Sequence, residues 1–83
     1  MKELNDVIKF GDLFDLYGKL LPPSQMQVAR LYFNEDLTIS EIAENLKISR
    51  QAIFDSLKKS ESKLIHIEEK VGALKIIQSL KKG

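Results

Sequence analysis

The chain has 83 residues and a mass of 9.5 kDa, which is the size of one small domain. Its 43% hydrophobic and 30% charged residues are typical of a soluble folded protein. The lack of cysteine excludes disulfide bridges, iron–sulfur sites and thiol nucleophiles, and a single histidine excludes a zinc finger. No apolar run is long enough to cross a membrane, so we expect a cytoplasmic protein.

The net charge of +1 conceals an asymmetry between the two halves of the chain. Residues 1–48 carry a net charge of −3, whereas residues 49–83 carry +4. A basic segment of this kind either contacts a polyanion such as nucleic acid or forms solvated helix faces. Charge alone leaves both interpretations open.

Apolar residues recur at helical spacing along the whole chain, which predicts an all-α fold in one domain. We expect an N-terminal helix over residues 1–21, because the Pro22-Pro23 pair that follows cannot continue it. A second helix is expected over residues 24–34, with Ser24 opening it through a capping box.

The most informative stretch is TISEIAENLKISRQAIFDSL, residues 38–57. Thr38 with Glu41 predicts the capped start of a short helix, and Ser49 predicts the capped start of a longer one. Two capped helices joined by a tight turn form the helix-turn-helix pattern. Lys47 stands at the turn position that usually holds a left-handed glycine, at a cost of about 1 kcal/mol. The apolar residues expected to fix the helix crossing are Ile42, Ala43, Leu46, Ile48, Ile53 and Leu57.

Packing Ile53 and Leu57 inward is expected to turn the N-terminal end of the second helix outward. The helix dipole and free N–H groups at that end favour a phosphate or a base edge. Arginine pairs with guanine and glutamine with adenine, and the lysines that follow either hold phosphates or form a solvated face, whereas Asp55 opposes phosphate contact. The candidate nucleic-acid-binding residues are Ser49, Arg50, Gln51, Phe54, Lys58, Lys59 and Lys63.

Residues 58–82 are predicted to form a basic helical tail, broken only near Gly72. Residues on alternating three- and four-residue steps predict a coiled-coil seam, formed by Leu57, Ser60, Leu64, Ile67, Val71, Leu74 and Gln78. A second apolar edge, which one seam cannot bury, consists of Ile65, Ile76, Ile77 and Leu80. Either the tail folds back on the first helix or it pairs with another chain, and we favour a homodimer through the tail.

The stretch from residue 13 to about residue 70 resembles the YlxM family of bacterial helix-turn-helix proteins, which is itself similar to region four of sigma factors. The matching runs are Leu13–Tyr17, Leu20-Leu21, Gln25-Met26, Leu31-Tyr32, Glu41–Glu44 and Ser49–Ile53 with Asp55. Lys47 departs from the glycine usual at that position. Because the family is typically encoded beside the signal recognition particle genes, the resemblance implies a regulatory protein with a role in that targeting pathway.

Nothing in the sequence predicts catalysis, a cofactor or a metal site. The carboxylate pairs Asp12 with Asp15 and Glu41 with Glu44 are expected on solvated faces, and His66 has no second ligand at helical spacing. The aromatic residues Phe14, Tyr17, Tyr32 and Phe33 are at core spacing, with a base-stacking platform as the alternative.

The sequence therefore favours a nucleic-acid-binding regulatory protein that is not an enzyme. The partners expected are DNA, components of the signal recognition particle and a second copy of the chain, and no membrane. The alternative is a protein- or ribonucleoprotein-docking module of the targeting machinery without sequence-specific DNA binding. A third possibility is a structural dimer in which the helix-turn-helix is unused.

Overall fold

A computed structural model describes residues 7–82 of the chain, and these residues contain helices and connecting turns but no strand. The all-α prediction is confirmed. The elements in chain order are α1 (Val7–Tyr17), the 3-10 turn η1 (Gly18–Leu20), α2 (Pro23–Phe33), α3 (Ile39–Leu46), α4 (Arg50–Val71) and α5 (Ala73–Lys82).

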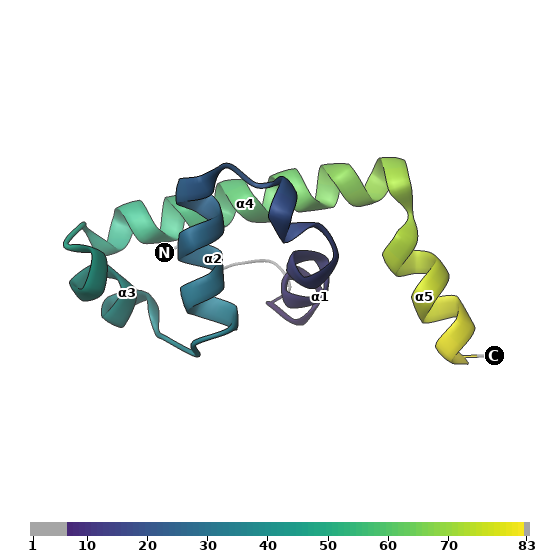
Figure 1. Cartoon of the computed structure of the whole chain (residues 1–83), viewed down its shortest axis with the longest axis horizontal. Helices are drawn as coiled ribbons and strands as arrows, with labels where there is room; N and C mark the ends of the chain where they lie inside the picture. Colours follow the sequence, from purple (N-terminus) through teal and green to yellow (C-terminus); the bar gives the residue numbers. More distant parts are fainter. Residues whose placement is uncertain (1–6, 83) are drawn as a thin grey trace.

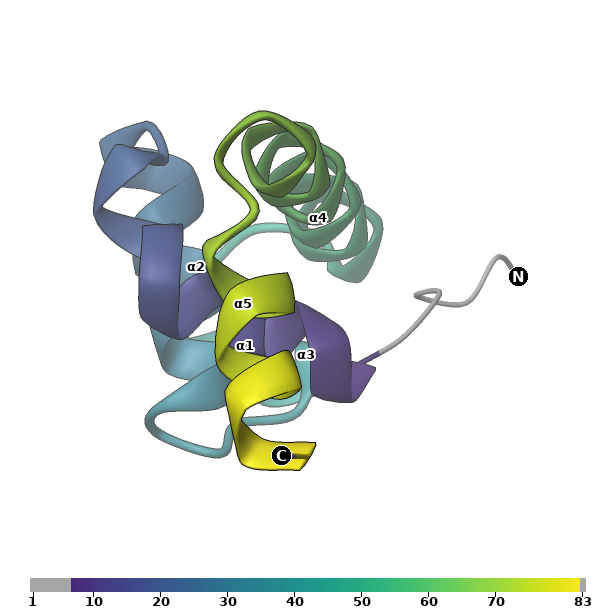
Figure 2. The same ribbon diagram turned by 90° about the vertical axis from the view of Figure 1, so that its right-hand side faces the viewer.

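Helix α4 is the long axis of the molecule, and its 22 residues span about 33 Å. Helices α1, α2 and α3 lie along one side of α4, while α5 turns away at its far end (Figure 1). Seen from that end, α5 lies beside α1 with α4 above them (Figure 2). The molecule is elongated, with extents of 44 × 23 × 21 Å.

The core forms along one face of α4. Ile53, Leu57, Ser60 and Leu64 follow each other at helical spacing, and each of them has no exposed surface. The Ser60 hydroxyl donates to the carbonyl oxygen of Ser56 at 2.8 Å, so the one small polar side chain in this face keeps a hydrogen bond. The first half of the predicted coiled-coil seam is therefore buried within its own chain. The last two seam positions, Leu74 and Gln78, lie on α5, because α4 ends at the predicted break at Gly72.

Aromatic rings fill the space between α1 and α2. The rings of Phe10 and Phe33 meet edge to face, with centroids 4.7 Å apart, and Phe14 stacks on Phe33 at 5.7 Å. A Cβ atom at Gly18 would lie 2.7 Å from the Phe14 ring, so the turn can pass over this ring only with glycine. Phe14 and Tyr17 are buried, which confirms the core interpretation of these two aromatics.

Two predictions for the N-terminal half are wrong: the end of the first helix and the start of the second. Helix α1 ends at Tyr17, and a 3-10 turn carries the chain to Leu20, so the helix stops before the prolines. Helix α2 begins at Pro23 with no side-chain cap, and Ser24 lies inside its first turn. Proline supplies this start itself, since its fixed φ suits the first helical position and its missing N–H would have been unpaired there. Residues 1–6 of the predicted first helix lie outside the described part of the chain.

The turn between α4 and α5 is fixed by Glu68, a carboxylate in the last turn of α4. Gly72 takes the left-handed conformation that ends α4, with φ of 71°. The Glu68 carboxylate accepts hydrogen bonds from the backbone N–H groups of Leu74 and Lys75, both at 3.1 Å, and so caps the start of α5. It also accepts the Tyr17 hydroxyl of α1 at 2.7 Å. One side chain thus joins α1, α4 and α5.

The same contacts set the acidity of both groups. Partial desolvation raises the pKa of Glu68, but the hydrogen bonds from Tyr17, Leu74 and Lys75 and the charge of Lys9 outweigh it and hold that pKa below its ordinary value. Desolvation and the bond to the Glu68 carboxylate raise the pKa of Tyr17. The ionised form of Glu68 is therefore the one that stabilises the fold.

We expect Glu68→Gln to lower the Tm by about 5 °C at neutral pH, because it removes the charge from a helix cap. The pKa of Glu68 is lowered by folding, so its contribution is complete above the ordinary value of 4.5 and is lost as the pH falls through the folded-state pKa. The difference in Tm between wild type and variant should therefore disappear in acid.

Thermal unfolding at several pH values measures this difference, and hydrogen exchange of the Leu74 and Lys75 amides locates it. Glu69→Gln is the matched control, since it makes the same charge change at an exposed neighbour. Equal Tm values for the two variants at neutral pH would contradict the capping role of Glu68.

Candidate nucleic-acid interface

Both helices of the predicted helix-turn-helix begin with a side-chain cap. Thr38 Oγ1 accepts the N–H of Glu41 at 3.1 Å, and Glu41 Oε1 accepts the N–H of Thr38 at 2.9 Å, which is a complete capping box. Ser49 Oγ accepts the N–H of Ala52 at 3.0 Å at the start of α4. These two predicted helix starts are confirmed.

The turn between α3 and α4 passes through Lys47 in the left-handed conformation, with φ of 58° and ψ of 43°. The N–H groups of Lys47 and Ile48 both donate to the carbonyl of Ala43, which closes the end of α3 in the manner of a glycine-ended helix. The backbone geometry expected at this position is thus formed by a lysine. Ile48, predicted to pack between the helices, is instead 46% exposed, because the left-handed residue before it turns the chain outward.

The two helices are held together by apolar contact. Ile42 of α3 and Ile53 and Leu57 of α4 have no exposed surface, and the small side chain of Ala43 is buried at the crossing. This packing fixes which side of α4 remains available to a partner.

The N-terminal end of α4 is open to solvent. Arg50, Gln51 and Asp55 are all exposed, as is Lys47 in the preceding turn. The Gln51 side chain is hydrogen-bonded within α4, since its Nε2 donates to Oδ1 of Asp55 at 2.9 Å. The spacing of four residues between Gln51 and Asp55 was a sequence signal for this pair.

Phe54 differs from its predicted placement. It was expected to point outward, but it is only 8% exposed. It lines a hollow of about 360 Å³ together with Ile39 and Ser40 of α3 and Arg50 and Gln51 of α4. Phe54 follows the buried Ile53 at the edge of the buried face of α4, so its apolar ring lies beside the first turn of α3 rather than in solvent.

The three candidate lysines divide into two groups. Lys58 is partly buried, and its Nζ lies 3.5 Å from Oε1 of Glu61, a carboxylate that is only 3% exposed. Its charge is therefore already engaged. Lys59 and Lys63 are exposed and lie one turn apart on α4. Only these two remain placed to follow a phosphate backbone.

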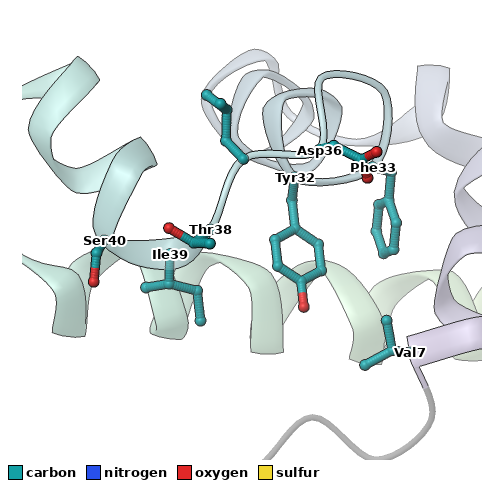
Figure 3. A pocket seen from close by; sticks show the side chains of 8 residues that line it. Val7, Tyr32, Phe33, Asp36, Thr38, Ile39 and Ser40 are labelled. Atoms are coloured by element: carbon teal, nitrogen blue, oxygen red, sulfur yellow. The ribbon is translucent and has the colours of Figure 1, made fainter.

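The described surface also has a hollow between the end of α2 and the start of α3, with Val7 of α1 at its edge. Its volume is about 570 Å³, and the ring of Tyr32 lies between Ile39 and Val7 in the view of Figure 3. Within residues 7–82 no group of three or more acidic, histidine or cysteine side chains could hold a metal ion. His66 is exposed, and Glu41 belongs to the capping box.

Helix α5 leaves an apolar surface uncovered. Leu74 is buried, so the start of the tail folds back on α1 as one of the two alternatives proposed. Further along α5, Ile76 is 60% exposed, Ile77 is 36% exposed and Leu80 is 76% exposed. None of the helices in the described residues is long and apolar enough to span a membrane.

A family model described as "Putative helix-turn-helix protein, YlxM / p13 like" matches residues 4–82, almost the whole chain. The chain belongs to this family. The resemblance found in the runs around the helix-turn-helix is thereby confirmed.

Proteins similar to this chain include UPF0122 proteins of several bacteria. A UPF0122 protein of Clostridium kluyveri is 40% identical in a match that covers 96% of this chain and 75% of that protein. UPF0122 proteins of Acetivibrio thermocellus and Desulforamulus reducens are 41% and 44% identical over 83% and 87% of this chain, and the match covers 59% of each. The chain thus spans three quarters or less of these relatives.

Proposed function

We propose that this protein is a nucleic-acid-binding regulator that reads duplex DNA with the N-terminal end of α4, acting in the cytoplasm and not as an enzyme. The observation that carries the proposal is the exposed start of α4, where Arg50 and Gln51 stand beside the helix N-terminus on a rigidly packed support. A helix-turn-helix docks this end of its second helix in the major groove.

The proposed contacts are fewer than the sequence predicted. Arg50 and Gln51 contact base edges, and the first backbone N–H groups of α4, which the Ser49 cap does not use, contact a phosphate. Lys59 and Lys63 follow the phosphate backbone along the next turns. Lys58 and Phe54 are left out, because one is paired with Glu61 and the other is buried.

We expect Arg50→Ala and Gln51→Ala each to weaken binding to the preferred duplex by about 1–3 kcal/mol, with little effect on a scrambled duplex. Lys63→Ala should weaken binding to both duplexes alike and reduce the salt slope by about one, because it removes one phosphate contact. Lys19→Ala is the control, an exposed lysine of the 3-10 turn outside the helix-turn-helix.

Fluorescence anisotropy at two salt concentrations measures these changes. The probes are a duplex selected from a random library, a scrambled duplex and signal recognition particle RNA. Binding of the double variant Arg50→Ala/Gln51→Ala to the selected duplex with wild-type affinity would reject the proposal.

The second candidate is a docking module for a protein or ribonucleoprotein of the targeting machinery. Two observations favour it, because both reduce the positive charge that the start of α4 offers to DNA. Lys58 is paired with Glu61, and the exposed Asp55 places a negative charge beside Gln51. The family resemblance suggests the signal recognition particle as that partner. Weak and equal binding to both duplexes, with tighter binding to the RNA probe, would select this candidate.

We further propose that the protein is a homodimer through α5. Ile76, Ile77 and Leu80 form an apolar edge on a helix that projects from the body of the molecule (Figure 1). A two-fold axis through this edge would set two copies of α4 on two half-sites.

We expect wild type to sediment as a dimer and Ile76→Ser/Leu80→Ser as a monomer, because the double variant removes the apolar edge. Analytical ultracentrifugation at micromolar concentration measures this difference. Gln78→Ala/Ser79→Ala, two exposed polar residues of the same helix, should remain dimeric. A wild-type protein that sediments as a monomer would exclude the dimer.

A further inference from the structure

We infer that Asp55 is a specificity-determining residue, which holds the Gln51 amide in the orientation that selects adenine over guanine. The inference rests on the proposed function and adds the base that this position of α4 reads. It begins from one hydrogen bond, in which Gln51 Nε2 donates to Oδ1 of Asp55 at 2.9 Å. Both side chains are exposed on successive turns of α4, next to Arg50.

The chemistry of the pair fixes which way the amide faces. An ionised carboxylate only accepts hydrogen bonds, whereas the two ends of a glutamine amide differ, one donating and the other accepting. The NH₂ group of Gln51 must therefore face Asp55, and its Oε1 must face away. Because the two residues are four apart on one helix, this arrangement exists before any partner binds.

An amide held in this way matches adenine. In the major groove adenine presents the N6 amino group as donor and N7 as acceptor. Gln51 Oε1 accepts from N6, and the second hydrogen on Nε2, which Asp55 leaves unused, donates to N7. Both bonds form without any change in the free protein's side chains.

The same amide does not match guanine. Guanine presents two acceptors, O6 and N7, at the edge where adenine has one donor and one acceptor. Gln51 Oε1 would face an acceptor there, and only one N–H of the amide is available. Turning the amide around would bring Oε1 against the Asp55 carboxylate and break the bond between them, which leaves two acceptors in contact.

The negative charge of Asp55 thus has two consequences. It lowers affinity for every duplex, because it lies near the phosphates, and it raises the discrimination between two purines at one position. Arg50, the preceding residue, remains the group suited to guanine at the neighbouring position. The start of α4 would therefore read two purines by different residues.

The test uses the whole chain and duplexes selected from a random library. The position at which Gln51→Ala loses its base preference identifies the base that Gln51 contacts. Wild type should bind the duplex with adenine there about tenfold more tightly than the duplex with guanine. Asp55→Asn should bind both duplexes more tightly and reduce the ratio to about threefold or less, because asparagine offers both a donor and an acceptor to either orientation of the amide.

Asp15→Asn is the matched control, since it makes the same charge change at an exposed position on α1 and should keep the wild-type ratio. Retention of the tenfold ratio by Asp55→Asn would overturn the inference, while sequence-specific binding itself would stand. The inference would also be overturned if every base preference of the wild-type protein were lost in Arg50→Ala and none in Gln51→Ala. A wild-type protein with no base preference anywhere would overturn both this inference and the proposed function.

Discussion

Burial of one face of α4 organises the whole fold, because three other helices pack against it. Ile53, Leu57, Ser60 and Leu64 lie on that face with no exposed surface, and α1, α2 and α3 all pack along the same side of the helix. A fixed buried face also fixes the exposed one. Arg50, Gln51 and Asp55 are therefore held outward at the start of α4 by residues further along the same helix.

The two ends of α4 are organised differently. At its start, a left-handed turn at Lys47 and the Ser49 cap set the helix against α3 and leave the first N–H groups near solvent. At its end, Glu68 connects the helix to α1 and to the start of α5 by hydrogen bonds. The start of α4 thus positions polar side chains toward solvent. The bonds of Glu68 fix the direction of α5, so that the uncovered apolar edge of α5 points away from the core.

Local signals in the sequence predicted the elements that local chemistry controls. The capping box at Thr38, the cap at Ser49 and the break at Gly72 follow from residue type and spacing, and the structure has all three. The predicted start of α2 at Ser24 was wrong, because either a serine cap or a proline at the first helical position can open a helix. Here Pro23 takes the first helical position.

Contacts between distant residues could not be predicted in this way. The bond between Tyr17 and Glu68 joins residues 51 apart, and neither has a sequence pattern that selects the other. Heptad spacing looks the same whether a face is covered by the chain's own helices or by a partner, so the seam leaves both arrangements open. Helical spacing predicts an outward Phe54, and residue type alone predicts a phosphate contact for Lys58. Neither signal reports that Phe54 is buried beside α3 or that Lys58 lies next to Glu61.

Backbone amide NMR during titration with the selected duplex shows whether a partner contacts the start of α4. We expect the largest chemical-shift changes at residues 47–55 and weaker changes at Lys59 and Lys63. Residues 73–80 of α5 should change little in the same titration. Changes concentrated on α5, or around Tyr32 and Phe33 beside the other hollow, would place the binding surface away from the helix-turn-helix and contradict a contact at the start of α4.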